Sequence, residues 1–546
     1  MEVNPDMTFR VLPIPFTEVG SPGLSQDGNW AAFPAADAKS NWDIYFMNTT
    51  SGESRRITTD SSNWINGADI SPDGSQIVYD RYNASTNNME IAVVSTVGGS
   101  SKKISDRGVF FPRWRRDGLR VGYVRGTLIG QSGRAEIWSI KPNGSDDRRE
   151  LVDSVSGEAR RFSWSPDGQS VCWIGYFSEQ CKEVTVYELS TKKARQVTFD
   201  RKNIEDVYWA PNDQIIFSSK KSGNYNLWMV PASGGSVTQI SKGTGRDYGA
   251  VSSRDGSKLL YQQAQFISHI WIAGTNGGNP HQITFDDAAL FSVSFSPDGK
   301  ELLFASDQPE GTKGGSFICS VDRDGRNRKQ LTSGEEWCDY PLQSPDGRWI
   351  IFSAYPLAQP SDSSRVFLID ARNPGAPKLV GKGTPQRWID EKTFISHDWV
   401  AFSDWLNRID GGQPQKFFED STWAIPLQGG KYIVYVDYRS GRQGLWVSSA
   451  PGVKDADLPS PRKLPCSLSS GGGFDRSGKF YYWVKNAGEL RRISIPSGKE
   501  EVIHRAFPGL TPLPFSSLDI SYDGKEIVYT DARVNSKLVM IENLFK

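Results

Sequence analysis

One short turn recurs along the whole chain and constrains its fold more than any other feature. It has the form Ser-Pro-Asp-Gly, or a near variant, and an apolar segment that ends on a large residue follows it. The eight clear copies are LSQDGNWAAF (24–33), ISPDGSQIVY (70–79), WRRDGLRVGY (114–123), WSPDGQSVCW (164–173), SSRDGSKLLY (252–261), FSPDGKELLF (295–304), QSPDGRWIIF (343–352) and ISYDGKEIVY (520–529). Weaker copies are WAPNDQIIF (209–217), WIDEKTFIS (388–396), PLQGGKYIVY (426–435) and FDRSGKFYYW (474–483). Twelve copies at a spacing of about 40–50 residues indicate a repeat architecture.

Each copy has the same internal order. A short strand ends in the Asp-Gly turn, which admits positive φ and reverses the chain. An apolar second strand follows, then a polar loop of variable length, a third strand such as EIWSIK or HIWIAG, and a second turn. A short fourth strand such as RRIT or HQIT closes the unit. Four antiparallel strands in a repeat of this length predict an all-β fold made of β-propeller blades.

The two ends of the chain complement each other. The twelfth copy stops after its third strand, whereas FRVLP (9–13) precedes the first copy and is similar to RKLPC (462–466). We infer that residues 8–12 supply the outer strand of the last blade, because such closure pairs strand edges that would otherwise be exposed. Deletion of residues 1–13 is therefore expected to lower the melting temperature.

These repeats resemble those of TolB-type, or WD40-like, β-propellers, and similar repeats occur in the propellers of prolyl-oligopeptidase-like peptidases. The resemblance covers residues 9–546 and concerns the propeller portion only, without the domain that precedes the propeller in TolB. Because TolB-like propellers are usually six-bladed, it implies two six-bladed rings, 14–285 and 286–546, with residues 8–12 closing the second. A single twelve-bladed ring is the alternative. The resemblance also slightly favours a periplasmic or extracytoplasmic location, although the N-terminus shows no signal peptide pattern.

Signatures of catalysis and of cofactor binding are lacking in the sequence. It contains no G-x-S-x-G, the nucleophile motif of hydrolase domains, and no H-E-x-x-H or C-x-x-C. The four histidines are His269, His281, His397 and His504, and none lies at metal-ligand spacing from another. We therefore predict no catalytic residues, no cofactor and no metal.

Charge and composition exclude several partner classes. Lys plus Arg and Asp plus Glu number 63 each, and no nucleic-acid-binding motif is present. No apolar stretch reaches the roughly 18–20 residues of a membrane span. Between residues 102 and 161 there are fourteen Lys or Arg against eight Asp or Glu, and we expect these bases on the outer rim of blades three and four.

Five cysteines do not make a disulfide framework. Cys172 and Cys181 flank a predicted hairpin, where symmetric pairing would set them opposite each other. A cross-strand disulfide is one interpretation, and two unbonded, partly buried thiols are the other.

Loops on one face of the predicted propeller are the best candidates for function. The loops between second and third strands vary most, at 81–90, 124–136, 307–316 and 355–365, and the segments that lead into the first strands combine aromatic and charged residues. Such combinations suit partner recognition, although aromatic residues are also needed between blades. The candidate partner-binding residues are Trp64, Phe111, Arg113, Asp206, Tyr208, Tyr248, Trp337, Asp339 and Tyr340.

The sequence thus favours a non-catalytic binding or scaffold module that recognises a protein, peptide or cell-envelope ligand through its channel-facing loops. It is interpreted as the sensor part of a longer bacterial protein, because similar propellers form the C-terminal portions of bacterial kinases and regulators. One alternative is a carbohydrate lyase or hydrolase with its site at the channel mouth. Another is a structural subunit of a larger assembly, and the oligomeric state is left open.

Overall fold

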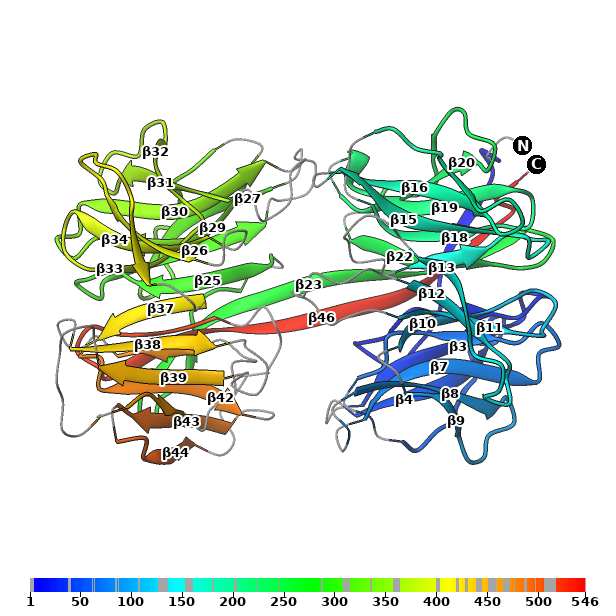
Figure 1. The fold of residues 1–546 in the computed structure, drawn as a ribbon, viewed down its shortest axis with the longest axis horizontal. Helices are drawn as coiled ribbons and strands as arrows, with labels where there is room; N and C mark the ends of the chain where they lie inside the picture. The colour runs from blue at the N-terminus through cyan, green and yellow to red at the C-terminus, as the bar shows by residue number, and fades with distance from the viewer. Residues whose placement is uncertain are drawn as a thin grey trace. The chain divides into compact units, whose positions relative to one another are not determined.

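The computed structural model of the protein is built almost entirely of β-strands (Figure 1). In the described part of the chain the one helical segment is the 3-10 turn η1 (Lys220–Ser222). The description covers residues 4–545 except 38–40, 61, 63, 84–85, 87, 107–108, 126–135, 153–160, 179–180, 201–203, 223, 244, 286–287, 308–314, 334–335, 357–363, 399–402, 419–421, 428–430, 438–443, 450–457, 459, 465–471, 476, 486–488, 496 and 505–516.

The chain divides into two compact units. Unit 1 comprises Met1–Gln265 and Val534–Lys546, and unit 2 comprises Phe266–Arg533. In both units the strands form antiparallel groups of four that follow the sequence repeats, which is the composition of propeller blades.

Five four-stranded sheets lie within unit 1 and follow one another along the chain. They are β2 (Gly23–Leu24), β3 (Trp30–Ala36), β4 (Trp42–Asn48) and β5 (Ser54–Arg56); β6 (Ala68–Ile70), β7 (Gln76–Asn83), β8 (Asn88–Ser95) and β9 (Lys102–Ser105); β10 (Val109–Trp114), β11 (Val121–Arg125), β12 (Glu136–Ile140) and β13 (Arg148–Val152); β14 (Phe162–Trp164), β15 (Ser170–Ser178), β16 (Cys181–Glu188) and β17 (Lys193–Gln196); and β18 (Ile204–Trp209), β19 (Gln214–Ser219), β20 (Asn226–Pro231) and β21 (Thr238–Gln239).

Unit 2 contains the corresponding groups. They are β25 (Leu290–Phe295), β26 (Glu301–Asp307), β27 (Ser316–Asp322) and β28 (Lys329–Gln330); β29 (Glu336–Gln343), β30 (Trp349–Pro356), β31 (Arg365–Asp370) and β32 (Lys378–Lys382); β33 (Thr384–Trp388), β34 (Thr393–Asp398), β35 (Ser403–Arg408) and β36 (Gln415–Phe418); β37 (Thr422–Leu427), β38 (Tyr432–Asp437), β39 (Gly444–Ser449) and β40 (Arg462–Lys463); and β41 (Gly473–Phe474), β42 (Phe480–Lys485), β43 (Glu489–Ser494) and β44 (Glu500–His504). The first two groups join into one sheet through a single parallel pair, Ser316 with Trp337.

The last sheet is shared between the units. It contains β1 (Thr8–Val11), β22 (Arg246–Ser252), β23 (Lys258–Gly274), β24 (His281–Gln282), β45 (Leu518–Ile520) and β46 (Glu526–Glu542). β23 and β46 are 17 residues long and hydrogen-bond to each other, and Figure 1 draws them in green and red. Each contributes one half to each unit, so the order β22–β23–β46–β1 completes unit 1 with strands from three distant parts of the chain.

The predicted closure by the N-terminal strand is present, but in a different unit from the one expected. Thr8 pairs with Glu542 and Val11 with Val539, which lie on the third strand of the last repeat. These residues of β46 belong to unit 1, whereas the sequence assigned them to a second domain that begins at residue 286. The compact units instead change at residues 265/266 and 533/534, inside strands, because a strand has no turn to mark where the chain leaves one unit.

The Asp-Gly turns are held by a repeated set of hydrogen bonds. In the copy at 164–173, Ser165 Oγ donates to Asp167 Oδ1 at 2.5 Å and accepts the N–H of Ser170 at 2.9 Å. Gly168 has φ of +70°, the left-handed region that glycine reaches without steric cost. The hydrogen bond from Ser165 keeps the pKa of Asp167 below its usual value. Asp167 is therefore part of the turn.

The hydrophobic core lies between successive sheets. Val78 and Ile91 of the β6–β9 sheet pack with Val121 and Tyr123 of the β10–β13 sheet, and all four are nearly inaccessible to solvent. Burying each such side chain stabilises the fold by about 1.5–3 kcal/mol before the cost of ordering the chain. This packing fixes each sheet against its neighbours and positions the first strands that carry the candidate site.

Candidate functional site

A β-bulge interrupts the first strand of several sheets near its start. The register shifts occur between Phe110 and Arg113, Tyr248 and Val251, Phe291 and Ser294, and Asp339 and Leu342. A residue with positive φ lies inside each shift, and these are Phe111, Gly249, Ser292 and Tyr340. Bulges redirect side chains and are common beside functional sites, so these four positions mark the candidate site.

Three of the predicted residues meet around Arg161 in unit 1. Arg161 Nη1 donates to Ser21 Oγ at 2.9 Å, and its Nε lies 3.5 Å from Asp206 Oδ1. Its Cζ lies 4.4 Å from the ring centroid of Phe111 and 5.5 Å from that of Tyr248. Only 12% of the Arg161 side chain and 4% of that of Asp206 are exposed. The cluster is thus a guanidinium held by one carboxylate and two aromatic faces.

The backbone at the bulges fixes the acidic partners of this cluster. The Gly249 N–H donates to Asp206 Oδ2, and the Phe111 N–H donates to Asp80 Oδ2 at 3.0 Å. Asp80 is buried, and it also accepts the Asn66 and Gly67 N–H groups. Burial raises the pKa of Asp80, while these donors oppose the rise.

Trp64 is connected to the cluster through hydrogen bonds. Its Nε1 donates to Asn66 Oδ1 at 2.7 Å, and Asn66 Nδ2 donates to Asp80 Oδ2 at 3.0 Å. Trp64 is 43% exposed and its ring lies 5.9 Å from that of Trp42. Four predicted residues, Trp64, Phe111, Asp206 and Tyr248, therefore belong to one continuous set of contacts.

Arg113 and Tyr208 lie in a second group, closer to the turn end of the first strands. Tyr208 Oη lies 3.3 Å from Ser252 Oγ. It also accepts a hydrogen bond from Arg116 Nη2 at 3.5 Å. Burial raises the pKa of Asp69, and the charge of Arg113 acts against that rise. These two predicted residues thus serve the packing of neighbouring first strands.

The remaining predicted residues come together in unit 2. The ring of Trp337 stacks with those of Phe291 and Tyr355, at centroid distances of 5.6 and 6.4 Å. Asp339 Oδ1 accepts the Tyr340 N–H at 2.7 Å, and Ser292 also hydrogen-bonds to this carboxylate. Burial raises the pKa of Asp339 to about 7, and the negative charge of Asp307 acts in the same direction.

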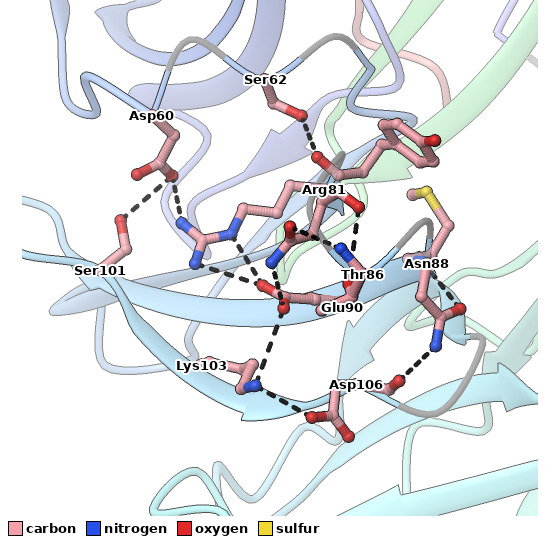
Figure 2. A network of polar contacts seen from close by, with 12 residues as sticks. Asp60, Ser62, Arg81, Thr86, Asn88, Glu90, Ser101, Lys103 and Asp106 are labelled. Atoms are coloured by element: carbon pink, nitrogen blue, oxygen red, sulfur yellow. Dashed lines mark hydrogen bonds and ion pairs between the residues drawn. The ribbon is translucent and has the colours of Figure 1, made fainter.

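A network of charged side chains surrounds the start of the loop between β7 and β8 (Figure 2). Arg81 lies 2.7 Å from Asp60 and 3.4 Å from Glu90, which is 3% exposed. Asn83 Nδ2 donates to Glu90 Oε1 at 2.7 Å, and Lys103 joins Glu90 to Asp106. The network joins β7 to β8, the two strands that the 81–90 loop connects. The other three predicted loops lie largely outside the described residues.

Arg161 and the Figure 2 network were not singled out from the sequence. Arg161 belongs to the basic stretch 102–161, whose bases were expected on an outer rim, yet its charge is buried beside Asp206. Arg120 of the same stretch is also buried, where its Nη1 lies 2.6 Å from Asp146. The local excess of positive charge was the signal for Arg161, but the acid that pairs with it lies on a different repeat.

Of the two interpretations of Cys172 and Cys181, the structure supports an unbonded thiol at Cys172 and contradicts a cross-strand disulfide. Cys172 is a free, fully buried cysteine. It lies opposite Val186, while Cys181 lies opposite Ser178, because the hairpin turns closer to its C-terminal side than symmetric pairing assumed. In the described part of the chain, no group of three or more His, Cys, Asp or Glu is placed to hold a metal ion.

Comparison with known families agrees with this geometry. Residues 161–376 match a family model described as the TolB beta propeller domain. This segment has TolB-type propeller repeats. It contains Arg161, Asp206, Tyr248 and Asp339, so the TolB-type segment carries parts of both clusters.

Curated relatives include proteins with and without a stated activity. The chain is 27% identical over 190 residues to dipeptidyl-peptidase 5 of Porphyromonas gingivalis, covering 32% of this chain and 27% of that protein. It is 28% identical over 254 residues to an uncharacterized protein of Agrobacterium fabrum, covering 43% and 83%. The chain therefore spans about a quarter of the length of the peptidase that it matches.

Among solved structures, TolB from Acinetobacter baumannii aligns with 19% identity over 54% of this chain and 77% of that chain, with a TM-score of 0.31. A TolB-like protein from Agrobacterium tumefaciens aligns over 61% and 87%, with 15% identity and a TM-score of 0.25. No helix in the described residues has the length and apolar character needed to cross a membrane.

Proposed function

We propose that this chain is a non-catalytic binding module that recognises a protein or peptide through the face where the first strands begin. The observation that carries the proposal is the group around Asp339 in unit 2. There Tyr340 is 49% exposed, its N–H donates to the Asp339 carboxylate, and Trp337 of the same strand stacks on Phe291. An aromatic anchor next to a charged group is a common composition of binding hot spots.

We further propose that each unit is a six-bladed ring. The contacts of Arg161 support this arrangement in unit 1, because they link residues from different repeats. Ser21 precedes β2, while Phe111, Asp206 and Tyr248 lie on β10, β18 and β22. Ser21 also forms an isolated parallel bridge with Gly67, just before β6. Arg161, which precedes β14, thus contacts residues from four other groups of strands in unit 1, and Gly67 joins the β6 group to one of these residues, Ser21.

A pull-down from native lysate tests the binding function. Three tagged chains are compared, namely wild type, the double variant Trp337→Ala/Tyr340→Ala, and Phe285→Ala. Phe285 is a matched control, because it is a 75% exposed aromatic residue of unit 2 outside the Asp339 group. We expect partners that wild type and the control retain and that the double variant loses. Identical partner sets for all three correctly folded chains would contradict the proposal.

A second candidate is favoured by the peptidase relatives, which include a second dipeptidyl-peptidase 5, from Porphyromonas endodontalis, at 23% identity over 317 residues. In this candidate the chain is the propeller portion of a peptide-handling enzyme. The sequence has no G-x-S-x-G, so the chain would admit or select peptides without cleaving them. Hydrolysis of a dipeptidyl chromogenic substrate by the purified chain would contradict the proposal that the chain is non-catalytic.

A further inference from the structure

Arg161 of unit 1 has more hydrogen-bonding capacity than the chain itself uses. A guanidinium carries several N–H donors in a rigid plane. Within the described part of the chain, Arg161 makes one hydrogen bond, from Nη1 to Ser21 Oγ at 2.9 Å. Its Nε lies 3.5 Å from Asp206 Oδ1, which is an ion pair but longer than an ordinary N–H···O hydrogen bond. Donors of this cation are therefore available to a further acceptor.

Asp206 is held by the backbone as well as by Arg161. Its Oδ2 accepts the N–H of Gly249, at the bulge of β22. Gly249 has φ of +68°, and a Cβ added there would lie 2.9 Å from Ser21 Oγ. The two acceptors of Arg161 are thus both fixed around one glycine, and the guanidinium does not draw Asp206 into a closer contact.

Aromatic rings shield part of the guanidinium from water. Its Cζ lies 4.4 Å from the ring centroid of Phe111 and 5.5 Å from that of Tyr248. These rings stabilise the positive charge, but 12% of the Arg161 side chain is still exposed. An N–H group that is shielded from water and has no acceptor is unfavourable. An acceptor that arrives from outside would therefore gain a charge-assisted hydrogen bond in a partly dry site.

The charges around the site are balanced. The four charged groups that act most strongly on the Tyr248 hydroxyl are the cations Arg161 and Arg246 and the acids Glu205 and Asp206. Arg246 also lies 4.0 Å from Glu205. A negatively charged ligand therefore meets as many cations as acids here, and the position of the Arg161 donors decides whether it binds.

We propose that Arg161 receives a carboxylate of the bound protein or peptide, either an acidic side chain or the C-terminal carboxylate. The forked N–H groups of a guanidinium match the two oxygens of a carboxylate. The inference rests on the proposed binding function, and it adds a contact in unit 1 and the charge of the ligand group. Arg161 lies on the same kind of face as the proposed site of unit 2, since it directly precedes the first strand β14.

Titration of the full chain with small probes tests this inference. The probes are N-acetyl-glutamate amide, which carries a side-chain carboxylate, N-acetyl-alanine, which carries a C-terminal one, and the neutral N-acetyl-glutamine amide. We expect at least one carboxylate probe to bind about tenfold more tightly than the glutamine probe. The tighter of the two carboxylates shows which source is preferred. Equal binding of all three, or no binding of either carboxylate, would overturn the inference.

Two variants and a control locate the binding. Arg161→Lys keeps the charge but removes the fork, and is expected to weaken carboxylate binding about tenfold. Asp206→Asn removes the acid that competes for Arg161, and is expected to strengthen binding about tenfold. Arg254→Lys makes the first change at an exposed arginine of unit 1, in the Asp-Gly turn after β22, and should leave the affinity unchanged.

The gain expected for Asp206→Asn separates a binding role of Arg161 from a structural one. An arginine that serves packing alone gives no gain in either variant. Weaker carboxylate binding by folded Asp206→Asn, or unchanged binding by folded Arg161→Lys, would overturn the inference. Thermal unfolding of each variant shows that the chain is folded, and the wild-type titration stands without any variant.

The outcome also separates this inference from the function on which it rests. If the probes do not depend on Arg161 while the pull-down depends on Trp337 and Tyr340, the carboxylate site fails and the binding function stands. If the pull-down shows no such dependence while the probes depend on Arg161, the proposed site of unit 2 fails and the carboxylate site stands.

Discussion

Single glycines in the Asp-Gly turns hold a backbone conformation that other residues reach only with strain. Gly74 has φ of +73°, and a Cβ added there would meet no heavy atom within 4 Å. We therefore expect Gly74→Ala to lower the free energy of unfolding by about 1 kcal/mol, through backbone strain alone. Gly375 also has open space around it but no positive φ, so Gly375→Ala should leave stability equal or slightly higher. Urea denaturation measures both, and equal losses would contradict this explanation.

Asp339 gives the protein a pH dependence of definite sign. Its pKa is raised by burial from 3.8 to about 7, with Asp307, Tyr340 and Tyr355 facing it. The folded chain therefore holds this proton more tightly than the unfolded chain, and its contribution to stability is lost as pH rises from about 4 to about 7. The stability of wild type relative to Asp339→Asn should fall across that window and be constant above it. Denaturation at several pH values checks this, and a difference that does not change with pH would contradict it.

At the scale of strands, Arg161 ties together the first strands of unit 1. Removing one member of a buried ion pair leaves an uncompensated charge, so Arg161→Met is expected to cost about 3 kcal/mol. Asp206→Asn removes the other charge, and the double variant should lose less than the sum of the two single variants. Denaturation of the four chains gives the coupling free energy. Strict additivity would show that the pair is not coupled.

The strands could be predicted well from the sequence. The contacts between residues of different repeats could be predicted only in part. The Asp-Gly turns, each with its Ser–Asp hydrogen bond, are local and can be recognised from four residues, as at Ser165 and Asp167. Phe111, Asp206 and Tyr248 were predicted because the segments that lead into the first strands combine aromatic and charged residues. Arg161 was not predicted. Its ion pair joins residues 45 positions apart, and such pairing depends on how successive blades face each other. The sequence left the state of Cys172 open between a free thiol and a disulfide, because the hairpin register depends on the position of the turn.

At the scale of the whole molecule, the N-terminus is a structural part of unit 1. β1 pairs with β46, and Leu12, which is 1% exposed, belongs to a core cluster with Leu538 and Met540. Deletion of residues 1–13 exposes the edge of β46 and is expected to lower the melting temperature by about 5 °C or more. Phe9→Ser, which changes a 48% exposed side chain of the same strand, should have a small effect. An unchanged melting curve for the deletion would contradict the role of β1.

The two long strands make each unit dependent on distant parts of the chain. Unit 1 needs residues 534–542 of β46 between β23 and β1, and unit 2 needs residues 266–274 of β23. A chain cut at 285/286, where the sequence suggested a domain boundary, therefore separates unit 1 from its own β46 segment. We expect the fragment 1–285 alone to lack a sharp unfolding transition, and to regain it when co-expressed with 286–546, with which it should co-purify at equal stoichiometry. Calorimetry and size-exclusion chromatography measure both effects. A fragment 1–285 that unfolds cooperatively by itself, and does not associate with its complement, would show that the shared strands are dispensable.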